Sequence, residues 1–127
     1  MIEPLEPMLA RADFGDMEAV VLKVVDGDTF TVLVPNVPPV FERIEVRIAG
    51  IDTPEMLDHR PAFRELAEQA RVRLVELLRG TVTLRQVRKD KYFRLNASVE
   101  VGGVDVGDIL VREGLAKRWN GSGAKPW

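Results

Sequence analysis

The sequence has no cysteine and a single histidine. Without cysteine, the chain can form neither a disulfide nor a thiolate metal site. No run of apolar residues approaches the roughly 20 that a membrane-spanning helix needs. Residues 1–20 also lack the basic start and apolar core of a secretory signal. We therefore expect no membrane partner, and a protein that is either cytoplasmic or the processed form of a secreted one.

The acidic charge of the chain is concentrated at its N-terminus. The 127 residues suffice for one domain with one core, and the formal net charge is −2. Residues 1–20 hold five acidic side chains and one arginine, a charge of −4, so the other residues together carry +2. A net acidic chain argues mildly against nucleic-acid binding, but the body of this one is basic. We expect a flexible acidic arm over residues 1–17 and a folded domain over residues 18–127.

Three segments in the first half of the domain have the patterns of β-strands. Residues 18–25 and 29–34 are rich in β-branched and apolar side chains, and the Asp-Gly-Asp sequence of residues 26–28 separates them. Asp-Gly between two such runs is a strong hairpin signal. Residues 41–48 alternate apolar and charged side chains, which predicts a half-buried strand.

A helix and two more strands are expected next. Apolar residues recur at helical spacing over residues 61–79. Pro61 fits the first helical position, and Gly80 stands where helices commonly end with a positive φ. Residues 81–88 and 95–101 have strand patterns, with a charged turn between them.

The last expected element is a short helix over residues 106–113, capped by Asp105 and closed by Gly114. Short strands, hairpin turns and few long connections predict a small closed β-barrel with helices at its side. The predicted fold class is α+β and mainly β: a five-stranded OB-fold β-barrel with two to three flanking helices.

Three polar clusters carry the chemistry of the sequence. The Asp-Gly-Asp-Thr of residues 26–29 is by itself a common turn, and the basic residues 89–94 are by themselves a common hairpin tip. The segment of residues 46–55 is more specific, because an arginine on a strand precedes an Asp and a Glu three residues apart, on a loop stiffened by Pro54.

The three clusters would suit phosphodiester hydrolysis if they converge. Asp28, Asp52 and Glu55 are carboxylates on loops at strand ends, and oxygen ligands suit Ca²⁺ or Mg²⁺ rather than zinc. Arg47 and Arg94 can each bind a phosphate through paired N–H donors. Metal and arginines neutralise charge that develops at the phosphate, and a carboxylate activates or orients water.

These residues give the chain a resemblance to the staphylococcal nuclease (thermonuclease) family, from about residue 19 to residue 119. The Asp-Gly-Asp-Thr turn, the Val-Arg-Ile-Ala-Gly-Ile-Asp-Thr-Pro-Glu segment and the Asp-Lys-Tyr turn occur in the family's order. The ending Leu-Val-Arg-Glu-Gly-Leu-Ala-Lys of residues 110–117 is also typical of it. The second segment is the most specific of these motifs.

The resemblance implies an OB-fold barrel and a calcium-dependent nuclease that cuts DNA or RNA to products with a 3′-phosphate. It assigns roles to the following residues: Asp28, Asp52 and the Thr53 carbonyl as calcium ligands, Arg47 and Arg94 as the phosphate-binding catalytic pair, Glu55 as the carboxylate that handles the attacking water, and Lys91 and Tyr92 as nucleotide contacts. We expect a monomer.

The chain departs from the family pattern at several positions. Phe93 stands where relatives usually have glycine, so we expect this turn to take a different path that avoids a positive φ, with Phe93 packed on the barrel or at the edge of the site. The loop after Glu55 is short. Trp119 is assigned to substrate stacking, with a hydrophobic plug on the barrel as the alternative. We expect the lone His59 to be an exposed polar residue.

Two other functions fit the same fold. In the first, the barrel is a non-catalytic module that binds nucleic acid or a protein partner. In the second, it is a purely structural barrel with solvated acidic turns. The retention of all the carboxylates and arginines favours the enzyme over both.

Overall fold

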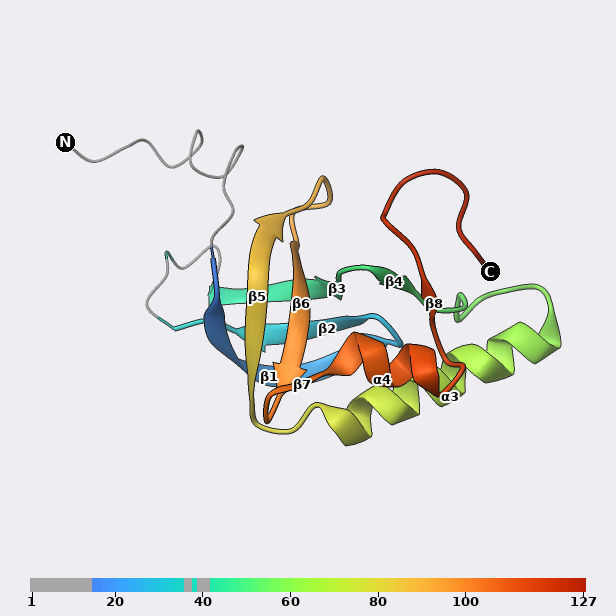
Figure 1. The fold of residues 1–127 in the computed structure, drawn as a ribbon, viewed down its shortest axis with the longest axis horizontal. Helices are drawn as coiled ribbons and strands as arrows, with labels where there is room; N and C mark the ends of the chain where they lie inside the picture. Colours follow the sequence, from blue (N-terminus) through green and yellow to red (C-terminus); the bar gives the residue numbers. More distant parts are fainter. Residues whose placement is uncertain (1–14, 36–37, 39–41) are drawn as a thin grey trace.

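The computed structural model describes residues 15–35, 38 and 42–127 (Figure 1). In chain order its elements are β1 (Met17–Asp26), β2 (Thr29–Leu33), β3 (Arg43–Ile48), β4 (Ile51–Asp52), α3 (Pro61–Leu77), β5 (Thr81–Lys89), β6 (Leu95–Val101), β7 (Val104–Asp105), α4 (Val106–Arg112) and β8 (Lys117–Arg118). The described residues are therefore mainly β with two helices, which confirms the predicted fold class.

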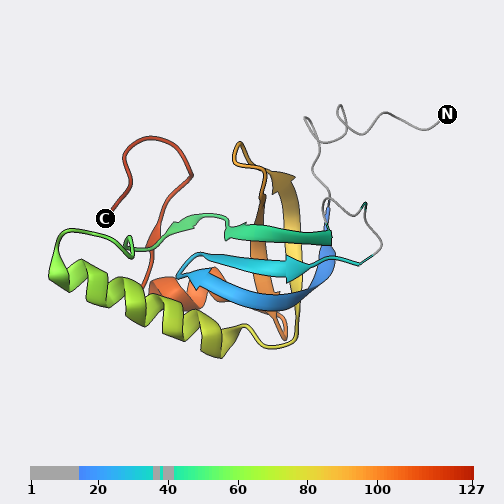
Figure 2. The same cartoon turned by 180° about the vertical axis from the view of Figure 1, so that it is seen from behind.

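Five strands close into a barrel. They pair in the order β3-β2-β1-β5-β6, and β6 pairs back to β3 in parallel, with Val46 opposite Leu95 and Ile48 opposite Ala97. The other four pairings of this ring are antiparallel. Figures 1 and 2 show α3 and α4 together along one side of the barrel. The predicted five-stranded OB-type barrel with flanking helices is confirmed.

Alternate residues of the barrel strands form the core. Phe30 and Val32 of β2 and Val46 and Ile48 of β3 are buried to 1% exposure or less. Successive side chains of a strand point to opposite faces, so the alternation in the sequence becomes an inner and an outer surface. Burial of each such side chain contributes roughly 1.5–3 kcal/mol to stability.

Helix α3 packs a narrow stripe of residues against the barrel. Its buried residues are Ala67, Ala70 and Leu74, which recur at helical spacing. Pro61 lies in the first turn, where its missing N–H has no helical partner. The helix ends at Leu77, two residues before the predicted end, because the next residue takes an extended backbone. No helix in the described part of the chain is long and apolar enough to cross a membrane.

The β1–β2 turn meets helix α3 at Gly27. This glycine does not have a positive φ. Glycine is needed here because there is no room for a side chain: a Cβ at this position would lie 2.7 Å from the Cβ of Ala70 and 3.0 Å from Oγ1 of Thr53. Glycine therefore lets the turn, the helix and the segment after β4 approach one another.

The second half of the domain adds a capped helix and a two-stranded ribbon. Asp105 caps α4 as predicted, since its carboxylate accepts a hydrogen bond of 2.8 Å from the backbone N–H of Asp108. Strands β4 and β8 pair through Ile51 opposite Arg118. The sequence did not predict these two strands, because two residues are too few to show alternation.

Strand β1 begins at Met17, one residue before the start predicted for the folded domain. Met17, expected in the arm, is already in β1 and lies opposite Leu84 of β5. The Asp16 carboxylate accepts hydrogen bonds from Nη1 of Arg85 at 2.8 Å and from the backbone N–H of Gln86 at 3.1 Å. These contacts tie residues 16 and 17 to β5. Residues 1–14 of the predicted arm lie outside the described residues.

The expected change of path at Phe93 is wrong. Phe93 has a φ of 59° and is 48% exposed, so it keeps the backbone conformation that favours glycine and does not pack into the barrel. The turn is fixed around it. The Asp90 carboxylate accepts hydrogen bonds from the backbone N–H groups of Tyr92 and Arg94, at 2.8 and 3.1 Å, and the backbone N–H of Asp90 donates to the carbonyl of Arg94 at 2.8 Å.

Gly27→Ala is expected to destabilise the fold. Its methyl group would overlap Ala70, and relief requires the turn and α3 to move apart, at a cost of about 1–3 kcal/mol in the free energy of unfolding. Urea unfolding of the variant measures this cost. Gly80→Ala is the control, because its Cβ meets open space and it tests only the cost of a φ of 67°. A Gly27→Ala protein as stable as wild type would show that the contact is not tight.

Candidate active site

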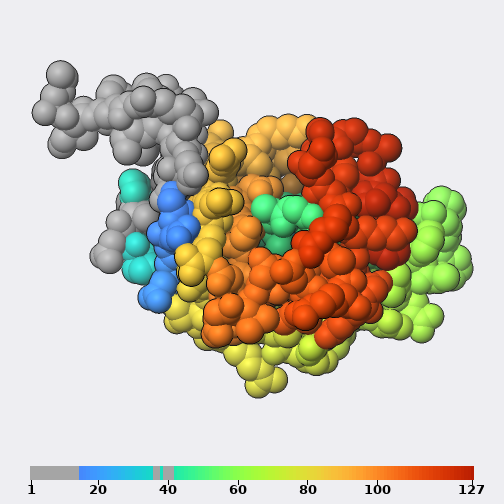
Figure 3. All heavy atoms as spheres, viewed as in Figure 1, coloured from blue at the N-terminus to red at the C-terminus, as the bar shows by residue number. Residues whose placement is uncertain are grey.

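Two adjoining hollows lie at the end of the barrel where β3 passes into β4. The large hollow has a volume of about 780 Å³ and is bounded by residues 47–51, by the β5–β6 turn and by the C-terminal segment, residues 119–127. The small hollow has a volume of about 130 Å³. Arg47, Arg94 and Lys125 line both. Figure 3 shows the recess, with green residues at its floor between the amber β5–β6 turn and the red C-terminal segment.

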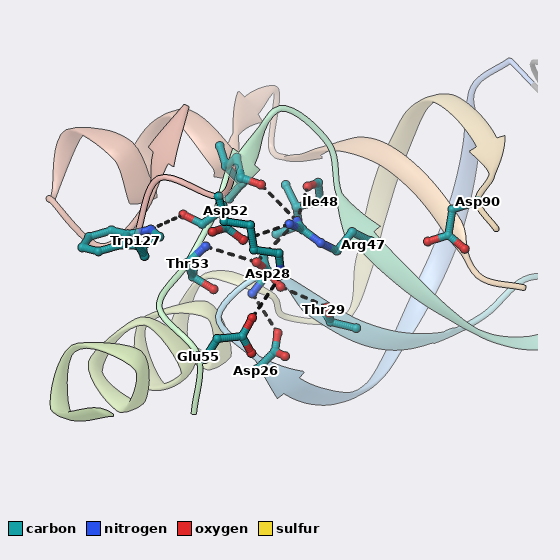
Figure 4. A network of polar contacts seen from close by, with 12 residues as sticks. Asp26, Asp28, Thr29, Arg47, Ile48, Asp52, Thr53, Glu55, Asp90 and Trp127 are labelled. Carbon is teal, nitrogen blue, oxygen red and sulfur yellow. Dashed lines mark hydrogen bonds and ion pairs between the residues drawn. The ribbon is translucent and has the colours of Figure 1, made fainter. Parts of the chain in front are cut away.

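The small hollow gathers the acidic side chains of the site (Figure 4). The turn after β1 and the end of β4 bring Asp28 and Asp52 together, and both are buried. Asp28 is fixed by two hydrogen bonds. Its Oδ2 accepts from the backbone N–H of Thr53 at 3.2 Å, and its Oδ1 accepts from the Thr29 hydroxyl at 3.1 Å. Glu55 lines the same hollow but is more exposed.

Arg47 joins the acidic residues to the backbone of the barrel. Its Nη1 donates to the carbonyls of Ile48 and Ile51 at 2.9 and 3.1 Å, and its Nη2 donates to Oδ1 of Asp52 at 3.2 Å. Nη1 also lies 3.4 Å from Oδ2 of Asp28. Among the described residues, these hydrogen bonds engage three of the roughly five N–H donors of a guanidinium group, so two are left for other partners.

Arg94 lies at the rim of both hollows and is held by Asp90. Its Nε donates to Oδ2 of Asp90, the residue that also fixes the backbone of the β5–β6 turn. Its guanidinium carbon is 5.2 Å from the centre of the Tyr92 ring. The turn therefore presents an arginine and an aromatic ring together, one beside the other.

The C-terminal segment forms one wall of the site. Trp119 lines the large hollow, with its ring centre 6.0 Å from the guanidinium carbon of Arg47. Nζ of Lys125 lies 3.0 Å from Oε1 of Glu55. The indole N–H of Trp127 donates to the Asp52 carbonyl at 2.7 Å (Figure 4).

Comparisons with known proteins give the family and the relatives that this chain resembles. The sequence model of the family described as "Staphylococcal nuclease homologue" matches residues 45–125. The chain is 34% identical over 99 residues to "Endonuclease YncB" of Bacillus subtilis (strain 168), covering 75% of this chain and 44% of that protein. It is 30% identical over 130 residues to "Protein ParB" of Escherichia coli, covering 94% and 68%.

The chain belongs to the staphylococcal nuclease homologue family. The resemblance found in the sequence is thereby confirmed, and family membership supports a nuclease-like function with a nucleic-acid substrate. The chain spans less than half the length of endonuclease YncB.

The nine residues to which the sequence assigned roles all line the two hollows. The small hollow holds Asp28, Arg47, Asp52, Thr53, Glu55 and Arg94, and the large hollow holds Arg47, Lys91, Tyr92, Arg94 and Trp119. Trp119 is half-buried and lies outside the barrel core, so its place is that of a wall residue and not of a plug. His59 is 90% exposed at its side chain, as expected.

Four further residues of the site were not singled out from the sequence. They are Asp26, Asp90, Lys125 and Trp127. Asp26 and Asp90 belong to motifs that were identified, so their position was a usable signal. Lys125 and Trp127 lie in a tail of irregular composition, which gave no signal for them.

Crowding of carboxylates makes the small hollow electrostatically unusual. Burial and the neighbouring Asp28 carboxylate raise the pKa of Asp26 to about 6. The same two causes raise the pKa of Asp52, although Lys125 and Arg47 oppose them. The raised pKa values mean that Asp26 and Asp52 resist ionisation, and a bound cation would favour their charged forms.

The donor chemistry of this hollow fits calcium. Ca²⁺ binds carboxylate, carbonyl and water oxygens in flexible geometry. Among the described residues, no three His, Cys, Asp or Glu side chains form a group that would hold a metal by themselves. A metal site that used the two buried carboxylates Asp28 and Asp52 would therefore require carbonyl and water oxygens in addition.

Asp26→Asn is expected to stabilise the calcium-free protein at pH 8. A pKa raised on folding means that the folded protein holds the proton more tightly, so ionisation of Asp26 lowers the free energy of unfolding as the pH rises from about 4 to about 6. Asparagine removes that loss and still offers an oxygen to the backbone N–H of Asp28. The gain should be roughly 1–2 kcal/mol, less than the full pKa difference implies because Asp26 is only half-buried.

Urea unfolding in chelator at pH 8 and at pH 4 measures the effect. The gain should be present at pH 8 and nearly absent at pH 4. Glu18→Gln, on the exposed face of the same strand, is the control and should change stability by less than about 0.5 kcal/mol at either pH. A gain of equal size at both pH values would show that the charge of Asp26 is not its cause.

Proposed function

We propose that the chain is a calcium-dependent nuclease that hydrolyses phosphodiester bonds in DNA or RNA and leaves a 3′-phosphate. One observation carries the proposal: two buried carboxylates, an exposed carboxylate and two arginines from four separate segments line one small hollow. Family membership adds support.

The two arginines would bind the phosphate. Arg47 has N–H donors left over after its bonds to Asp52 and to two carbonyls, and those bonds fix the direction in which the donors point. Arg94, which lines the same hollows and is held by Asp90, would contribute further donors. Donors fixed before the reaction stabilise the negative charge that develops on the phosphate oxygens in the transition state.

Glu55 would accept a proton from the attacking water. It is exposed enough to meet solvent, and its Oε1 accepts a hydrogen bond from Nζ of Lys125. The oxygen of the water attacks phosphorus, the bond from phosphorus to the 5′ oxygen breaks, and that oxygen leaves as a hydroxyl after it gains a proton. Asp28, Asp52 and the Thr53 carbonyl would hold calcium, which supplies positive charge next to the phosphate and the water.

The large hollow would receive the nucleotide. Tyr92 is 67% exposed and Trp119 is half-buried, and each presents an aromatic ring to this hollow. Bases stack on aromatic rings with little preference for sequence. Lys91 would add positive charge for the phosphate backbone at the same rim.

Cleavage of single-stranded DNA is expected with calcium and is expected to stop in chelator. Magnesium should bind but support less turnover, because its stricter octahedral geometry changes the site. Gel assays with a labelled oligonucleotide, followed by identification of the product ends, measure this. Cleavage in chelator would rule out the metal dependence. Binding without cleavage in calcium would favour the non-catalytic module.

Arg47→Lys is expected to lower turnover on the order of 10²–10³-fold although the charge is kept. Lysine cannot span the Ile48 and Ile51 carbonyls and also present paired donors to a phosphate. Turnover and the free energy of unfolding should be measured together on the same variant. Arg71→Lys on the exposed face of α3 is the control. Near-normal turnover in folded Arg47→Lys protein would remove Arg47 from the catalytic role.

A further inference from the structure

The C-terminal segment is fixed to the site by its last residue, Trp127. Besides its hydrogen bond to the Asp52 carbonyl, Trp127 meets the ring of Phe63 on α3 edge-on, with the ring centres 5.9 Å apart. Nζ of Lys117 lies 4.1 Å from the centre of the same indole. Figures 1 and 2 both show the segment curving back so that its end lies beside the loop that precedes α3. A segment without helix or strand is therefore held at a defined place.

This anchoring places Lys125 at the junction of the two hollows. Of the lysines in the described residues, Lys125 alone lines both. Its Nζ lies 3.0 Å from Oε1 of Glu55 and 5.8 Å from the centre of the Trp119 ring. The hydrogen bond to Glu55 raises the pKa of Lys125, so the ammonium group stays charged. An ammonium group has about three donors, and its bond to Glu55 uses one.

The charges around Lys125 define what its other donors would bind. The guanidinium of Arg47 already pairs with Asp28 and Asp52, and that of Arg94 pairs with Asp90. The positive charges of both arginines are thus matched by carboxylates, so a phosphate that enters beside them would be bound more tightly if a further cation lay at the same place. The Lys125 side chain is 51% exposed, so its remaining donors are accessible.

We propose that Lys125 is a further phosphate-binding cation of the substrate site, beside Arg47, Arg94 and Lys91, and that Trp127 is the residue that positions it. The proposal rests on the proposed function, because it concerns the same nucleic-acid substrate. In the free protein Lys125 binds Glu55, and in the complex it binds Glu55 and a backbone phosphate together. The C-terminal segment is therefore part of the substrate site.

The first experiment measures binding without cleavage. A fluorescent single-stranded thymidine oligonucleotide is titrated with wild-type protein in chelator at several salt concentrations, and then with Lys125→Met. Methionine keeps the length of the stem and removes the charge. Affinity should fall roughly three- to tenfold at low salt, as for one lost phosphate contact. The slope of log affinity against log salt should become shallower by about 0.7. Lys125→Arg should restore both.

The control is Lys23→Met, an equal loss of charge on the exposed face of β1, in neither hollow. It should leave the affinity and the salt slope close to those of wild type. A Lys125→Met slope equal to that of wild type would overturn the proposal.

A second experiment separates a phosphate contact from simple neutralisation of Glu55. The double variant Glu55→Gln, Lys125→Met is compared with the single variant Glu55→Gln, and neither protein has a negative charge at position 55. A direct contact predicts that removing the ammonium still weakens binding and still lowers the salt slope there. If the effect of Lys125→Met disappears in this background, Lys125 acts only on Glu55 and the proposal fails.

The role of Trp127 is tested by additivity. Trp127→Ala should reproduce the lower salt slope of Lys125→Met, and the double variant should show no further loss, because Trp127 acts through Lys125. Additive losses would overturn the positioning role.

The proposed function can fail separately from this proposal. One outcome is that wild-type protein binds the oligonucleotide in a way that depends on Lys125 and yet does not cleave it with calcium. That result would support the phosphate contact and refute the nuclease.

Discussion

The site depends on the buried guanidinium of Arg47. It holds the carbonyls that end β3 and begin β4, and it lies between the carboxylates of Asp28 and Asp52, which come from two different parts of the barrel. Two carboxylates this close repel each other, and the positive charge between them offsets that repulsion. Removal of a partner from a buried ion pair commonly costs about 3–5 kcal/mol, because the remaining charges are left uncompensated. Arg47 therefore has a structural role in addition to its proposed contact with phosphate.

The small hollow concentrates charges that a barrel chosen only for stability would avoid. Burial raises the pKa of Asp26 and of Asp52, which means that their charged forms are held at a cost. The apolar core opposes that cost, since the strands that deliver Asp28 and Arg47 also carry the fully buried Phe30 and Val46. Clusters of perturbed carboxylates in a hollow are typical of functional sites, where charge is arranged for a ligand and not for the fold.

The sequence predicted what is encoded locally. Alternation along β2 and β3 and helical spacing along α3 are periodic over several residues, so both elements could be placed. The requirement for glycine at position 27 could not be predicted, because it arises from contacts with Ala70 and Thr53 and not from the turn itself. The wall of the site was also out of reach. The hydrogen bond between Lys125 and Glu55 joins residues 70 positions apart in the sequence, and that between Trp127 and Asp52 joins residues 75 positions apart. Nothing in a tail of glycine, serine and lysine indicates either contact.

Phe93 shows that backbone geometry, rather than residue type, places Arg94. A non-glycine residue in the left-handed region costs about 1–2 kcal/mol, yet Phe93 adopts a φ of 59° there. The Asp90 carboxylate accepts the N–H groups on either side of it, from Tyr92 and Arg94, and its other oxygen accepts from the Arg94 side chain. One carboxylate thus sets both the path of the turn and the direction of the arginine. Asp90 thereby holds Phe93 in a backbone conformation that glycine would adopt more easily.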